Sequence, residues 1–231
     1  MNARFIRLIT RRPLAEDSMD HLEPHGAKQD NTHCPAFVTA CEQIFETLPL
    51  YALDLGCAGG GLVADWTDKG HCAIGLEGSD YPLIHSFGEW PGDGTLRTCD
   101  IGRRFTLQLP NLGSTLLFHV ITAWAVLEHI PEERVSMLFS NVVRHLRPDG
   151  LFFAYIGLQP DPPWHVTVRT KEWWIGQMRQ VGLEPLEDWW PFSPEETPRG
   201  YGNTTCPFDE DIRNPEQSEL GFHLAAARGR W

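Results

Sequence analysis

A short apolar run that stops at a cluster of glycines and passes at once into a helical pattern sets the fold class of this chain. Residues 51–55 read YALDL, residues 56–61 read GCAGGG, and residues 62–70 read LVADWTDKG. A buried strand that leads through glycines into a helix is typical of a parallel α/β sheet. Such sheets bind ligands beyond the carboxyl ends of their strands, so the glycine turn marks the candidate site.

Strand and helix patterns alternate through the rest of the chain. Further apolar runs predict strands at 71–78, 96–101, 116–124, 151–156, 183–188 and 221–228. Helical spacing predicts helices within 36–48, 132–146 and 170–181, with Thr170 as a cap and Gly182 as a stop. Pro148, Asp149 and Gly150 predict a turn before the fifth strand. The alternation indicates a Rossmann-like α/β fold: a seven-stranded, mostly parallel sheet with helices on both faces.

The length of 231 residues suits one domain, which we place at 35–231. Residues 1–34 form a polar N-terminal extension and a candidate lid, and their first, arginine-rich part is interpreted as a frayed tail. Residues 190–219 are rich in proline and acids and are interpreted as an insertion. Residues 182–219 contain ten acidic side chains and only two basic ones, Arg199 and Arg213. This balance favours a solvated acidic surface over a lid that selects the substrate.

The net charge and the cysteine pattern limit the expected binding partners and cellular location of the protein. Asp+Glu 31 against Lys+Arg 19 gives a formal charge of −12, which argues against nucleic acid. No apolar run approaches the roughly 20 residues that cross a bilayer, so no membrane span is expected. The six cysteines form no C-x-x-C pair, which favours reduced, packed thiols and a cytoplasmic location.

Acidic residues stand at the ends of the first three predicted strands. Glu77 ends the second strand, where a carboxylate can accept both hydroxyls of a ribose. Asp100 ends the third strand, and Asp54 stands two residues before the first glycine of the turn. The turn begins G-x-x-G rather than G-x-G-x-x-G, and Asp54 would repel a pyrophosphate but attract a cationic group. The pattern therefore predicts a nucleoside cofactor and favours S-adenosylmethionine (SAM) over NAD.

These segments resemble the motifs of the class I SAM-dependent methyltransferases. DLGCAGGG resembles their first motif, IGLEG their acidic motif and TCDI their adenine-side motif, while FHVITAWAVLEHIPEE and HLRPDGLFFAYI resemble the segments around their fourth and fifth strands. The likeness covers about residues 35–190 and is greatest to the branch that includes ubiquinone-type and many small-molecule or sugar methyltransferases. It implies an antiparallel last strand at 220–228.

The resemblance also implies roles for matching positions. Asp54, Gly56 and Gly59 would flank the methionine part of SAM, Glu77 would hold the ribose, and Asp100 with Ile101 would hold the adenine. The full set of implied cofactor-binding residues is Asp54, Gly56, Cys57, Ala58, Gly59, Glu77, Gly78, Asp100, Ile101, Ala123 and Trp124.

Two positions depart from the family pattern. His119 stands where an Asp is usual, but it lies on the strand away from the cofactor end, so we expect it to affect packing only. Ala125 stands where an acid is frequent, which puts a direct polar contact to cofactor or acceptor in doubt.

The candidate catalytic residues are Glu128 and His129, after the fourth strand, and His165, after the fifth. An alcohol acceptor gains from a base near the operating pH, whereas an amine needs only to be uncharged. His129 is either this base or a structural imidazole, and His165 either meets the acceptor or is a satisfied loop histidine. A metal ion held by His129, His165 and an acid such as Asp161 is an alternative, but the spacing matches no recognised metal motif and none is expected.

We therefore expect a SAM-dependent methyltransferase that acts on a hydroxyl of a small molecule or glycan. N- or C-methyl transfer on the same scaffold, an NAD-dependent oxidoreductase and a SAM-binding protein without catalysis remain as alternatives. The oligomeric state is not predicted.

Overall fold

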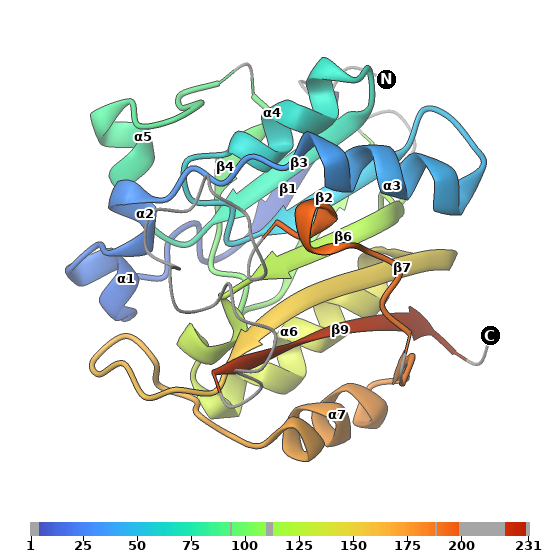
Figure 1. Cartoon of the computed structure of the whole chain (residues 1–231). Helices are drawn as coiled ribbons and strands as arrows, with labels where there is room; N and C mark the ends of the chain where they lie inside the picture. The colour runs from blue at the N-terminus through green and yellow to red at the C-terminus, as the bar shows by residue number, and fades with distance from the viewer. Residues whose placement is uncertain (1–4, 93, 110–112, 188, 199–219, 230–231) are drawn as a thin grey trace.

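A seven-stranded sheet with the order β4-β3-β2-β6-β7-β9-β8 runs through the protein (Figure 1). Its strands are β2 (Tyr51–Leu55), β3 (Cys72–Glu77), β4 (Leu96–Thr98), β6 (Phe118–Trp124), β7 (Leu146–Gly157), β8 (Leu183–Pro185) and β9 (Gly221–Arg228). The pairs β2–β3, β2–β6, β3–β4 and β6–β7 are parallel, whereas β9 is antiparallel to β7 and β8. The Rossmann-like sheet with an antiparallel last strand is thus confirmed.

The structure is a computed structural model that describes residues 5–92, 94–109, 113–187, 189–198 and 220–229. Most of the predicted acidic insertion, residues 199–219, lies outside this part of the chain, as does Cys206. Within it, no helix combines the length and the apolar character needed to span a membrane.

Helices cover both faces of the sheet. α3 (Pro35–Phe45) and α4 (Gly61–Asp68) lie on one face, and α6 (Glu132–His145) and α7 (Lys171–Gln180) lie on the other (Figure 1). Neighbouring strand residues point to opposite faces, so Leu53 packs with side chains of α6 and α7 while Ala52 packs with those of α3 and α4. Every residue of β3 and β6 is buried, which explains why both read as continuous apolar runs.

A local signal in the sequence sets the start of α7. α7 begins after Thr170, whose side chain accepts a hydrogen bond from the Trp173 amide as predicted. The strand expected to begin at residue 151, after a turn at 148–150, begins earlier than predicted, because β7 starts at Leu146. Phe118 pairs with Leu146 and Val120 with Leu151, so the residues between form a bulge within the strand.

The N-terminal segment is folded rather than frayed, contrary to the prediction for its arginine-rich part. β1 (Arg7–Thr10) pairs antiparallel with β5 (Phe105–Gln108), a strand that the sequence analysis did not identify. Ile6 is buried in the core cluster beside Phe105 and Leu107, which anchors the start of the chain. The segment then forms two short helices, α1 (Met19–Leu22) and α2 (Gly26–Gln29), and α5 (Tyr81–His85) lies against α2.

The described cysteines are free and buried. They are Cys34, Cys41, Cys57, Cys72 and Cys99. Burial raises the pKa of the Cys34 thiol to about 11 and that of the Cys99 thiol to about 12. These thiols are packed core groups rather than a reactive set, as the sequence predicts.

Candidate active site

A cavity of about 550 Å³ opens at the carboxyl ends of the central strands. Segments that follow β2, β3, β6 and β7 form one part of its wall, and residues between 15 and 30 form another. Figure 1 shows α1 and α2 of that N-terminal segment beside these strand ends. Ten predicted site residues line the cavity: Gly56, Ala58, Glu77, Gly78, Asp100, Ile101, Trp124, Glu128, His129 and His165. Four others lie outside the lining: Asp54, Cys57, Gly59 and Ala123.

The glycine turn brings backbone to the edge of the cavity. Gly56 has a φ of 71°, in the left-handed region that favours glycine. A Cβ at this position would lie 2.4 Å from Cγ2 of Val126, in the segment after β6. Gly56 therefore lets the turn approach the segment after β6 closely. Gly56 and Ala58 both line the cavity.

The other two predicted site residues of the turn, Cys57 and Gly59, pack away from the cavity. The Cys57 thiol lies against Gly75 of β3, where an added Cβ would stand 2.7 Å from Sγ. The Gly59 amide donates to the Asp30 carbonyl at 2.9 Å. A Cβ on Gly59 would lie 2.6 Å from Oδ1 of Asn31. This side of the turn thus binds the N-terminal segment to the sheet.

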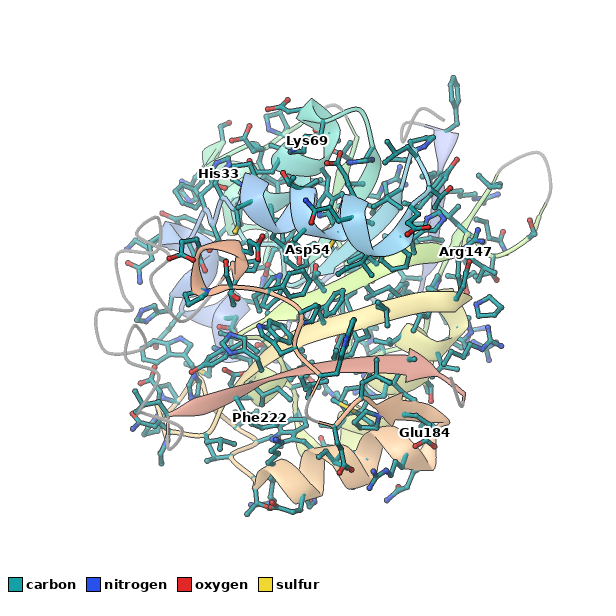
Figure 2. The ribbon with its side chains drawn as sticks, turned by 45° about the vertical axis from the view of Figure 1, so that its right-hand side comes forward. His33, Asp54, Lys69, Arg147, Glu184 and Phe222 are labelled. Carbon is teal, nitrogen blue, oxygen red and sulfur yellow. The ribbon has the colours of Figure 1, made fainter. Side chains whose placement is uncertain are left out.

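Asp54 is buried near the middle of the molecule (Figure 2) and does not line the cavity. The Thr122 hydroxyl donates to its Oδ1 at 2.6 Å. Burial raises the pKa of Asp54 to about 7, although the Thr122 hydrogen bond opposes the shift. A nearby cation would therefore stabilise the ionised form of Asp54.

Glu77 connects β3 to the glycine turn. Its Oε2 accepts from the Ala58 amide at 2.9 Å, and its Oε1 accepts from the Ser79 amide at 3.0 Å. Burial raises the pKa of this carboxyl, and the backbone donors oppose the shift. Each oxygen keeps further lone-pair capacity toward the cavity, which suits a pair of ligand hydroxyls.

Asp100 stands at the next strand end and is held by two kinds of donor. Its Oδ1 accepts from the Gly102 amide at 2.9 Å, and its Oδ2 lies 3.7 Å from the Arg134 guanidinium. Arg134 also forms an ion pair with Asp17, which lowers the pKa of Asp17 to about 2. The sequence analysis missed Arg134 and Asp17, because their positions show no motif and meet only in the fold.

These features test whether the site fits a nucleoside cofactor. Carboxylates at successive strand ends border one cavity, and the glycine turn exposes backbone between them. Nε1 of Trp124 is buried without a hydrogen-bond partner in the described structure and belongs to the same lining. Asp54 and Glu77 beside the turn oppose a pyrophosphate and favour a cation. The residues fit SAM.

Glu128 is the most buried acid of the cavity wall, at 1% exposure. It lies in a 3-10 turn, Leu127–His129, that follows β6. Its Oε1 accepts from the Gly157 amide at 2.9 Å, and its Oε2 has no partner among the described residues. Burial raises the pKa of Glu128, while the neighbouring His129 and His165 lower it.

The two predicted histidines meet edge to face beside Glu128. Their ring centroids are 4.8 Å apart. His129 Nδ1 lies 3.0 Å from Oδ2 of Asp20, and His165 Nδ1 lies 2.6 Å from the Gln159 carbonyl. Burial lowers the pKa of His129, but the bond and charge of Asp20 outweigh it and raise the pKa overall.

The N-terminal segment contributes contacts that the sequence analysis did not foresee. Besides Asp20, the Glu23 carbonyl accepts from Nε1 of Trp164 at 3.0 Å. The His25 ring packs edge-on against Trp164 with centroids 4.9 Å apart. The segment therefore bridges the cofactor end and the histidine end of one cavity.

His119 and Ala125, the two departures from the family pattern, have distinct positions. His119 accepts from the Tyr51 amide at 3.0 Å, at the amino end of β2 and away from the cavity. Ala125 has a φ of 52°, lines the cavity and donates its amide to the Tyr155 carbonyl at 3.0 Å. Its side chain adds no polar group there.

Comparison with known proteins identifies the family. A family model described as a methyltransferase domain matches residues 27–186, well over half of the chain. A search of curated proteins found no match. Because the match covers the glycine turn, Glu77, Asp100 and the cluster at 128–165, it decides against an NAD-dependent oxidoreductase.

Solved structures share the fold. A SAM-dependent methyltransferase from Clostridium acetobutylicum superimposes with a TM-score of 0.58 at 14% identity, over 88% of this chain and 94% of that one. The 1,6-didemethyltoxoflavin-N1-methyltransferase of Burkholderia thailandensis gives 0.51 at 15% identity, over 84% and 79%. Magnesium protoporphyrin IX methyltransferase from Synechocystis gives 0.50 at 14% identity, over 84% and 82%. With the family match, these findings make the chain a member of the methyltransferase domain family and a class I SAM-dependent methyltransferase.

Proposed function

We propose that this methyltransferase transfers its methyl group to a hydroxyl of a small molecule or sugar. One observation carries the proposal: Glu128, His129 and His165 gather on the wall of the cofactor cavity, with Asp20 bonded to His129. An uncharged amine would need no such group, whereas a hydroxyl must lose a proton as its oxygen attacks.

The two ends of the cavity have separate tasks in this proposal. Glu77 binds the ribose hydroxyls, Asp100 and Ile101 bind the adenine, and Gly56 and Ala58 border the methionine part. Asp54 lies behind the turn and balances the positive charge of the amino acid group. The acceptor occupies the end bordered by His129 and His165.

Bound SAM supplies an electrophilic methyl group on a sulfonium. The chain holds the acceptor oxygen in line with the methyl carbon and the sulfur, which is chiefly a matter of orientation. The acceptor oxygen would take the methyl group as the carbon–sulfur bonding pair leaves with sulfur, and the hydroxyl proton would pass to Nε2 of His129. Asp20, on Nδ1 of the same ring, fixes the tautomer that leaves Nε2 free to accept.

The names of similar structures keep other acceptors in view. They include an N1-methyltransferase and a porphyrin methyltransferase, and at about 15% identity they carry only the fold. The Asp20–His129 pair is what favours a hydroxyl over a nitrogen acceptor in this chain.

The test is methyl transfer from isotope-labelled SAM to a panel of sugars, phenols and amines, with the products identified by mass and NMR. We expect a methyl ether, and we expect His129→Gln to lower kcat by at least about a hundredfold with SAM affinity retained. Labelling of amines alone would refute the hydroxyl assignment. Tight SAM binding with no product from any acceptor class would favour a binding protein.

A further inference from the structure

Three potential ligand atoms converge at the histidine end of the cavity. The carboxylate of Glu128 and one nitrogen each of His129 and His165 lie within 4.8 Å of one another. Glu128 Oε2 is buried and has no hydrogen-bond partner in the described structure. A buried, unpaired carboxylate oxygen is costly, so this atom points to a positively charged ligand.

The other polar atom of each residue already has a partner. Glu128 Oε1 accepts from the Gly157 amide, His129 Nδ1 faces Asp20, and His165 Nδ1 faces the Gln159 carbonyl. Both rings therefore carry their proton on Nδ1 and present the lone pair of Nε2. Histidines that bind metals are oriented in this way, by a carboxylate or carbonyl on the second ring nitrogen.

We propose that Glu128, His129 and His165 form a binding site for a divalent first-row transition metal ion. Two imidazoles and one carboxylate suit zinc, cobalt, iron or manganese, whereas calcium and magnesium prefer oxygen ligands alone. Three protein ligands leave a position open to the cavity. The sequence analysis considered Asp161 as the third ligand, and the structure places Glu128 there instead.

The cluster needs only a small contraction to bind such an ion. Metal–ligand bonds of about 2.0–2.2 Å separate tetrahedral ligand atoms by roughly 3.4 Å. The widest pair is at most 4.8 Å apart, and His165 lies in the loop between β7 and α7. Glu128 and His129 are fixed by the short turn after β6.

The use of the ion rests on the proposed function. A hydroxyl bound at the open position would have a lower pKa, so its proton would pass to water and Nε2 of His129 would act as a ligand instead of a base. The site would then select acceptors by an oxygen that reaches the ion. The cation site itself does not depend on the acceptor.

The test is metal binding by the full chain after removal of metals with a chelator. Co²⁺ is titrated with visible absorption as the readout, and Zn²⁺, Mg²⁺ and Ca²⁺ are titrated by calorimetry. We expect one equivalent of Co²⁺ or Zn²⁺ with micromolar or tighter affinity, absorption bands of a four- or five-coordinate site, and much weaker Mg²⁺ and Ca²⁺ binding.

Variants assign the ligands. Glu128→Gln keeps the shape of the side chain, and His165→Ala removes a loop side chain, so both should fold; we expect each to weaken Co²⁺ binding about a hundredfold. Asp20→Asn removes the negative charge beside His129 and should weaken Co²⁺ binding about tenfold. His85→Ala, on the exposed side of α5, is the matched control and should bind as the wild type does. SAM affinity, measured on each, reports that the cofactor end is intact.

Absence of stoichiometric Co²⁺ and Zn²⁺ binding would overturn the site, as would equal affinity in Glu128→Gln and His165→Ala, or a preference for Mg²⁺ or Ca²⁺. If methyl ethers form at full rate in metal-free protein, the ion has no role and His129 acts directly as the base. If the ion binds through these ligands but only amines are methylated, the site stands and the proposed function falls.

Discussion

At the scale of single residues, the two buried carboxylates beside the glycine turn differ in how many hydrogen bonds they accept. Asp54 shares one hydrogen bond with Thr122, and its pKa is raised to about 7. Glu77 accepts two backbone amides and joins β3 to the turn. Burial raises the pKa of both carboxyls, so ionisation costs stability at each, and the two amides on Glu77 offset part of that cost while holding the turn in place.

Asp54→Asn should stabilise the cofactor-free protein at pH 8. The pKa of Asp54 in the folded state lies above its ordinary value of 3.8. The contribution of the protonated carboxyl to stability is therefore fully present below pH 3.8 and is lost as the pH rises through about 7. The variant removes a penalty of up to about 4 kcal/mol. Urea unfolding at pH 8 and pH 4 measures this, and we expect a gain only at pH 8.

The same substitution should weaken SAM binding at pH 8 by at least about tenfold, because the ammonium of the methionine part loses a nearby negative charge. Calorimetry with SAM checks this. Unchanged SAM affinity in Asp54→Asn would contradict the role proposed for Asp54.

Glu77→Gln should lower SAM affinity by at least about tenfold, because an amide cannot accept from the Ala58 and Ser79 amides and from both ribose hydroxyls. A modest fall in melting temperature should accompany it. Titration with SAM and a thermal scan measure the two effects. Glu133→Gln, an exposed change on α6, serves as the control, and equal SAM affinities in the two variants would exclude a ribose role for Glu77.

At the scale of elements, the N-terminal segment is the part of the fold that depends most on distant partners. It pairs β1 with β5, joins Asp17 to Arg134 and Asp20 to His129, and lines the cavity from Ala15 to Asp30. Its own helices are each a single turn long and owe their stability to these contacts.

SAM should slow hydrogen exchange in this segment. A ligand in the cavity stabilises the elements that contact it, so amides between 15 and 30 should exchange at least about tenfold more slowly at saturating SAM. Amides of α7, on the far side of the sheet, are the internal control. Equal rates with and without SAM, in protein shown to bind it, would mean that the segment is not coupled to the cofactor.

His145 of α6 contacts the two-stranded sheet formed by β1 and β5. Its Nε2 accepts from the Leu107 amide at 3.1 Å, its Nδ1 donates to the Asn141 carbonyl, and its ring stacks on Phe105. Burial lowers the pKa of His145 to about 4. Between about pH 6.5 and 4, His145 is therefore protonated in the unfolded chain but neutral in the native state.

Comparison with His145→Gln should isolate this effect. The wild type should lose on the order of 3 kcal/mol relative to the variant as pH falls from 7 to 4.5, although the variant is the less stable protein at pH 7. Urea unfolding across this range gives the difference, from which the opposite contribution of Asp54 cancels. A difference that does not vary with pH would show that His145 titrates normally.

At the scale of the whole molecule, the sheet and the site could be predicted to different extents. Strands covered on both faces, such as β3 and β6, are continuous apolar runs, and Thr170 and the glycines mark element ends, so the fold class was accessible. β1 and β5 are only four residues long, and two of the four residues in each are polar or charged, so each strand is too short for a periodic signal. Their pairing joins residues about a hundred positions apart, which no local pattern records.

The candidate site divides in the same way. Glu77 and Asp100 follow directly from strand ends, because parallel strands bring their carboxyl ends to one edge. Asp20 and Arg134 do not, since their partners His129 and Asp17 are distant in sequence and their own surroundings resemble ordinary surface. The sequence also does not show that Cys57 packs inward while Ala58 faces the cavity. That difference depends on the contact between Cys57 and Gly75.

Removal of residues 1–34 should affect the entire protein. The shortened chain loses Ile6 from the core and the partner of β5, so it should unfold at lower temperature and bind SAM at least about tenfold more weakly. Thermal unfolding and calorimetry measure both. A chain of residues 35–231 that matches the full protein in both would show that the N-terminal segment is dispensable.

The orientation of Cys57 has a consequence for the lifetime of the enzyme. A sulfonium methyl donor is an alkylating agent, and a thiolate is among the strongest nucleophiles that a protein offers it. Cys57 lies between two residues of the cavity wall, yet its sulfur is turned into the core and burial holds its pKa well above the ordinary value. We therefore expect this buried, protonated thiol to resist methylation by the donor, so that the enzyme does not inactivate itself.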